Sequence, residues 1–98
     1  MTVAVEKELD LGVPRAEILS GVERLLRRLG VDGTPTPDGE VTRFHGPGDV
    51  TIEVGPMPEE RIRYPILFPR TLMVLRGAPE ALEKIHLAIL HAFLRPTG

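Results

Sequence analysis

The 98 residues of this chain include no cysteine, tryptophan, asparagine or glutamine. Without cysteine the chain can form no disulfide, no thiolate nucleophile and no cysteine-ligated zinc or iron–sulfur centre. No stretch approaches the ~20 consecutive apolar residues that a membrane-spanning helix needs. The acidic, alternating N-terminal segment is not typical of a signal peptide. These absences lead us to expect a cytoplasmic protein that does not contact a membrane.

Aromatic and basic residues are also too few or too balanced to suggest a nucleic-acid partner. Only 4% of the residues are aromatic, and the formal net charge is −2. Asparagine and glutamine, the residues that read adenine through two hydrogen bonds, are missing altogether. Stacking of single-stranded bases requires aromatic side chains among basic ones. We therefore do not expect nucleic acid as a partner.

Arginine and proline are abundant where lysine and the amides are scarce. The chain has ten prolines, and its twelve basic residues comprise ten arginines and only two lysines. Few thermolabile residues and many loop prolines are recurrent in thermophile proteins. A GC-rich genome would favour the same residues, so the thermophile-like composition has two explanations.

The hydrophobic periodicity predicts a single α+β domain that covers residues 1–98. Alternating apolar residues indicate strands, and apolar stripes with a period of 3.6 residues indicate helices. Glycine and proline clusters separate these segments, and residues 31–39 read as a loop. The sequence predicts strands over residues 3–11, 40–45, 50–54, 60–68 and 71–76, and helices over 14–29 and 79–94.

This order of elements favours a two-layer sandwich. Four or five antiparallel strands would carry both helices on one face, in the order β-α-β-β-β-(β)-α. The strand over residues 60–68 is interrupted by Pro65, which restricts it to an edge or breaks it. The arrangement resembles helix-grip and TATA-binding-protein-like architectures at the level of the fold. No residue motif of either group is found here, so the resemblance implies an architecture and no activity.

The last predicted helix has more apolar surface than one core needs. One stripe contains Leu82, Ile85, Ile89 and Phe93, and a second stripe about a third of a turn away contains Leu87, Leu90 and Leu94. The first stripe suits the domain's own sheet. The second predicts either contact with a partner or the wall of an apolar pocket, unless a strongly curved sheet covers both.

The predicted strand over residues 71–76 is likewise apolar on both faces. Leu72 and Val74 would face one side of the sheet, and Met73 and Leu75 the other. If helices cover one face only, one of these pairs is left on the surface, unless a neighbouring loop shields it. We therefore expect a small interaction module that forms a homodimer through an apolar helix or sheet face. The expected interface residues are Leu87, Leu90, Leu94, Met73 and Leu75.

A binding protein for a small apolar ligand is the alternative. In this hypothesis a helix-grip-like pocket lies between the sheet and the last helix. A few polar groups beside core-facing positions would line it, as in most ligand pockets. The candidate pocket residues are Lys7, Arg63, Tyr64 and His86.

No motif for catalysis, a cofactor or a metal is found in the sequence. Ser20 is the only serine and lies in the middle of a predicted helix, without a nucleophile elbow. His86 and His91 are five residues apart, which is not the spacing of a helical metal pair. We expect no cofactor and no catalytic role. An enzyme would require Lys7, His45, Tyr64 and His86 to meet in one cleft.

Two runs of charge have both a functional and a plain structural interpretation. Arg24, Arg27 and Arg28 lie on the outer side of the first predicted helix, where they could bind phosphate or an acidic partner. Arginine near a helix C-terminus is also favourable for the helix dipole. Three carboxylates on one face of the first strand (Glu6, Glu8 and Asp10) could hold a cation, or could protect an edge strand from aggregation.

Overall fold

The computed structural model describes residues 4–58 and 71–93. Within these ranges the chain forms five strands and two α-helices, with a short 3-10 turn at Pro47–Asp49. The elements in chain order are β1 (Val5–Leu11), α1 (Arg15–Arg28), β2 (Thr36–Asp38), β3 (Val41–His45), β4 (Thr51–Pro56), β5 (Thr71–Gly77) and α2 (Pro79–Phe93).

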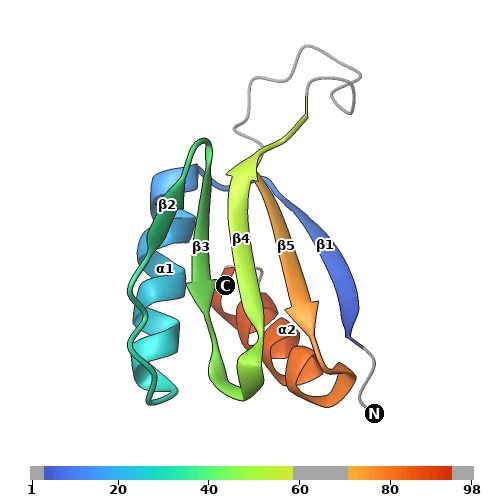
Figure 1. Cartoon of the computed structure of the whole chain (residues 1–98). Helices are drawn as coiled ribbons and strands as arrows, with labels where there is room; N and C mark the ends of the chain where they lie inside the picture. Colours follow the sequence, from blue (N-terminus) through green and yellow to red (C-terminus); the bar gives the residue numbers. More distant parts are fainter. Residues whose placement is uncertain (1–3, 59–70, 94–98) are drawn as a thin grey trace.

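The strands form one antiparallel sheet in the order β1-β5-β4-β3-β2. The first and last strands in sequence, β1 and β5, are therefore neighbours, and β1 and β2 are the two edges. Both helices lie against the same face of the sheet (Figure 1), with α1 on β4 and α2 on β5. The predicted α+β two-layer fold is confirmed.

Alternation along each strand separates a covered face from an open one. In β5, Thr71, Met73 and Leu75 are buried, whereas Leu72 and Val74 are only half-buried. The same alternation places Ile52 and Val54 of β4 inside. Helices α1 and α2 close the core with one apolar stripe each. The core consists of Leu11, Ile18, Val22, Leu25, Leu26, Phe44, Val50, Ile52, Val54, Met73, Leu75, Leu82, Ile85 and Ile89.

Helix α1 ends as its sequence predicts. Gly30 follows the C-cap Leu29 with a φ of 88°. The Val31 amide donates to the Leu26 carbonyl at 3.0 Å, and the Gly30 amide donates to the Arg27 carbonyl at 3.1 Å. These two bonds make a Schellman motif, in which glycine readily takes the left-handed position. The chain then turns away from α1 towards β2.

One segment that was predicted as a loop forms a short strand instead. Residues 31–39 were expected to form a loop, but Thr36–Asp38 form β2, which pairs with β3. Pro37 is compatible with this position because β2 is an edge strand, whose outward amide has no ladder bond to make. The strand expected over residues 60–68 lies outside the described residues.

Candidate functional site

Helix α2 presents a second apolar flank beside its core stripe. Leu82, Ile85 and Ile89 are buried, as the first stripe predicts. Leu87, by contrast, is 49% exposed, and Leu90 is half-buried. We call these two residues the α2 seam. The third residue of the predicted stripe, Leu94, lies outside the described residues.

A lysine from the edge strand identifies the side of α2 on which the seam lies. The Nζ atom of Lys7 in β1 is 3.3 Å from Nδ1 of His86 and 3.6 Å from Oε2 of Glu83. His86 and Glu83 come just before the seam along the same flank of α2. Leu90 therefore lies on the β1 side of the helix, one turn after His86, and Leu87 lies one turn after Glu83 on the outward side.

The Lys7–His86 contact brings together two of the four residues predicted for a ligand pocket. Arg63 and Tyr64 lie outside the described residues. The side chains of Lys7 and Glu83 are 39% and 58% exposed, so this contact is at the surface. The aliphatic stem of Lys7 lies along the core side of β1, and the ammonium group of Lys7 reaches outward. A charge that points inward from an edge strand also discourages pairing with a second sheet.

The structure corrects the sheet part of the predicted interface. Met73 and Leu75 are 0% exposed and belong to the chain's own core, so they cannot contact a partner. The apolar residues of β5 on the open face are Leu72 and Val74. The sequence could not distinguish the two pairs, because both faces of β5 are equally apolar.

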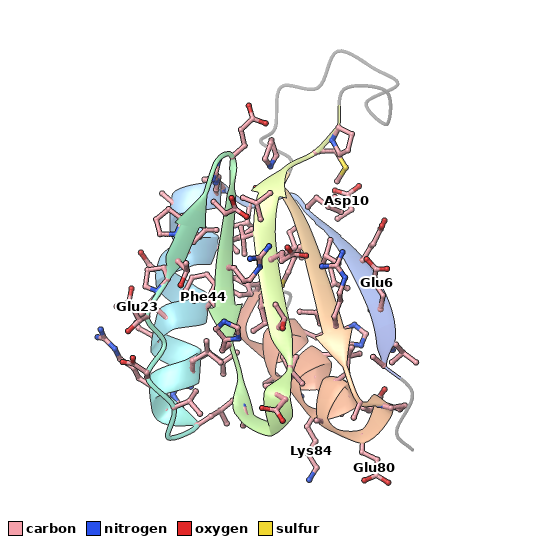
Figure 2. The ribbon with its side chains drawn as sticks, in the orientation of Figure 1. Glu6, Asp10, Glu23, Phe44, Glu80 and Lys84 are labelled. Atoms are coloured by element: carbon pink, nitrogen blue, oxygen red, sulfur yellow. The ribbon has the colours of Figure 1, made fainter. Side chains whose placement is uncertain are left out.

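Charged side chains surround this outer apolar pair. Glu53 of β4 accepts hydrogen bonds from Arg43 at 2.9 Å and from Arg76, and Arg76 also reaches Glu6 at 3.1 Å. The hydrogen bond from Arg43, with a further contribution from Arg76, holds the pKa of Glu53 below its ordinary value, although partial burial opposes this shift. The same pair raises the pKa of Arg43. Figure 2 shows Glu6 and Asp10 along β1.

The open face of the sheet is acidic overall. By register, two arginines (Arg43 and Arg76) share it with five carboxylates: Glu6, Glu8, Asp10, Asp38 and Glu53.

The edge strand β1 is a poor surface for pairing with itself. The side chains of Glu6, Glu8 and Asp10 all point to the open face. In the antiparallel register that places Glu8 of one β1 strand opposite Glu8 of another, the pairs formed by these three residues would each join two carboxylates. Like charges directly opposite destabilise a sheet. Among the described residues, the α2 seam is an apolar surface with no carboxylate of its own.

The residues proposed for an enzyme site do not all converge. Lys7 and His86 meet on the helix side of the sheet, but His45 is an exposed residue of β3 on the open face. Tyr64 is outside the described residues. Across residues 4–58 and 71–93, no group of three or more His, Asp or Glu side chains is arranged to hold a metal ion.

The pocket of the alternative hypothesis was expected between the sheet and α2. Ile85 is 2% and Ile89 is 0% exposed, and both belong to the core cluster that joins α2 to the sheet. Two hollows in the described part of the chain lie between α1 and α2 instead. Sequence reasoning missed this location, because it depends on how closely the two helices approach.

None of the helices within the described ranges is long and apolar enough to cross a membrane. Comparison of the chain with protein families, with curated proteins and with solved structures found no match.

Proposed function

We propose that this protein is a non-catalytic interaction module that forms a homodimer through the α2 seam. The observation that carries the proposal is the 49% exposure of Leu87 beside the half-buried Leu90. Val5 and Leu9, on the core side of the neighbouring edge strand, are also only half-buried. Val5 and Leu9 pack against the core cluster, whereas Leu87 leaves apolar surface exposed on α2. The cytoplasmic location expected from the sequence is part of the same proposal.

An antiparallel pair of α2 helices is the arrangement that best suits the α2 seam. With a two-fold axis through Leu87, the two copies of Leu87 meet, and Leu90 of each copy lies beside the contact. Glu83 and His91 are four residues before and after Leu87. The antiparallel arrangement therefore places Glu83 of each copy opposite His91 of the other. A carboxylate facing an imidazole is a favourable pair, unlike the carboxylate pairs at β1.

The size of the seam predicts a weak dimer. Burying a whole leucine side chain contributes roughly 1.5–3 kcal/mol, so covering the exposed half of Leu87 contributes about 1 kcal/mol per copy. The two copies together contribute about 2 kcal/mol, or about a 30-fold difference in Kd. Two leucines per copy are far fewer than the roughly 20–30 residues that each partner contributes to a typical stable interface. We therefore expect a Kd in the micromolar range or above.

Light scattering after size-exclusion chromatography tests this proposal over a concentration series. The wild-type mass should approach twice 10.8 kDa at high concentration and fall on dilution. Leu87→Glu should remain monomeric at every concentration. The matched control is Leu29→Glu, because Leu29 is 44% exposed at the far end of α1. A monomeric wild type up to about 1 mM, or equal loss of association in both variants, would overturn the proposal.

A further inference from the structure

A solvent-exposed groove runs between α1 and α2. It has two lobes, with volumes of about 520 and 440 Å³, and Arg24, Ala92 and Phe93 line both of them. Each lobe falls in the size range of small-molecule sites. Arg24, Arg28 and His91 are exposed, so their polar ends can meet a ligand from solvent.

Small residues on the facing helices shape the floor of the groove. Gly21 of α1 and Ala88 and Ala92 of α2 line the larger lobe with Phe93. The ring of Phe93 lies so close to Gly21 that a Cβ atom there would be 2.5 Å from its Cε1 and Cζ atoms. The floor of the groove is therefore apolar and partly aromatic, whereas the rim of the groove is cationic.

Within residues 4–58 and 71–93, the arginines at the rim have no carboxylate partner. Arg27 on the same helix pairs with Glu23 at 2.6 Å, and Arg43 and Arg76 are paired on the sheet. In the part of the chain that the structure describes, no ion pair or hydrogen bond engages the side chain of Arg24 or Arg28. They are one helical turn apart, where like charges repel. An anion between them would remove that repulsion.

We propose that the larger lobe binds a small phosphomonoester with an apolar or aromatic body. The guanidinium groups of Arg24 and Arg28 offer planar pairs of N–H donors to the phosphate oxygens. His91 stands across the groove from them. The body of the ligand lies on the floor against Phe93. Glu17, which lines the smaller lobe, repels an anion and directs the phosphate to the Arg28 end.

Two-dimensional NMR of the ¹⁵N-labelled 98-residue chain during titration with phenyl phosphate tests this site. We expect saturable shifts at α1 and α2 amides, with a Kd on the order of 1 mM or below, and weaker binding of inorganic phosphate. Loss of one charged hydrogen-bonding group should weaken binding about tenfold or more in Arg24→Gln and in Arg28→Gln. Arg27→Gln is the matched control, because Arg27 lies on the same helix but does not line the groove; it should change the Kd less than about twofold.

Three results would overturn the proposal. They are no saturable shift up to about 20 mM phenyl phosphate, equal weakening in Arg27→Gln, or inorganic phosphate binding as tightly as phenyl phosphate. His91 borders both the groove and the proposed dimer contact, so it is left unchanged in these variants. Leu87→Glu should bind phenyl phosphate like the wild type. This outcome separates failure of the groove from failure of the dimer.

Discussion

Replacing Gly33 with alanine should destabilise the protein through a contact that only the structure shows. Gly33 is buried just after α1 and has a φ of 71°, a conformation that alanine adopts only with strain. A Cβ atom at this position would lie 2.9 Å from the backbone oxygen of Glu23. That oxygen belongs to the helix and cannot move aside as a flexible side chain could.

Gly30 provides the matched comparison for the size of this effect. Its φ of 88° is also left-handed, but a Cβ atom there meets nothing within 4 Å. Gly30→Ala should therefore cost only the left-handed conformation, about 1 kcal/mol. Gly33→Ala carries the same cost and adds the strain of overpacking, which is typically 1–3 kcal/mol. We expect a loss of about 3 kcal/mol in the free energy of unfolding for Gly33→Ala.

Urea unfolding followed by circular dichroism measures both changes, at a protein concentration held constant so that association does not differ between samples. The expected order is wild type, then Gly30→Ala, then Gly33→Ala, with the last clearly separated from the second. Equal losses in the two variants would show that the segment after α1 does not lie against the Glu23 carbonyl. The reverse order would refute the reasoning altogether.

Two further predictions concern the charged sheet face and the core. Because the folded-state pKa of Glu53 is depressed, its ionised form contributes stability at neutral pH that is lost as pH falls through that pKa. The difference in the free energy of unfolding between wild type and Glu53→Gln should therefore shrink on acidification. Urea unfolding at a series of pH values measures this difference. A difference that stays constant with pH would contradict the pairing of Glu53 with Arg43. Ile89→Ala, at a fully buried position, should lower the free energy of unfolding by about 3 kcal/mol. Leu90→Ala, on the half-buried flank of α2, should lower it by about 1 kcal/mol. Equal shifts of the two variants in thermal unfolding would contradict the assignment of the two faces.

Local sequence patterns predicted the elements whose formation depends mainly on hydrophobic periodicity or on backbone preference. The apolar stripe of α1, the stop at Gly30 and the core stripe of α2 all follow from periodicity and backbone preference. The short strand β2 was missed because Pro37 and its neighbours have a loop composition. Pairing with β3, a contact beyond the segment itself, makes it a strand.

The surfaces were harder to predict, because they depend on register and on helix position. Val74 and Met73 are similar in hydrophobicity, and only the side on which the helices lie decides that Met73 is inside. The ion pairs of Arg76 with Glu6 and Glu53 need the strand order β1-β5-β4. The groove beside Arg24 needs the separation of two helices, which no local pattern contains.

One contact in the structure joins two residues of the candidate pocket that are far apart in the sequence. Lys7 is the single charged residue on the core side of β1, and its Nζ atom contacts Nδ1 of His86, 79 residues later. The ammonium group of Lys7 must reach the surface to remain solvated, and there it meets the polar side chains of α2 that lie nearest to it. The predicted partners Arg63 and Tyr64 remain outside the described residues.

Cross-linking through a single introduced thiol tests the proposed dimer most directly, since the natural chain has no cysteine. A disulfide needs Cα atoms within about 7 Å, which the two-fold contact provides at position 87. Leu87→Cys should convert to a covalent dimer under mild oxidation, and Leu29→Cys, equally exposed but remote, should stay monomeric. Equal yields from both variants, or none from either, would contradict a dimer formed through α2.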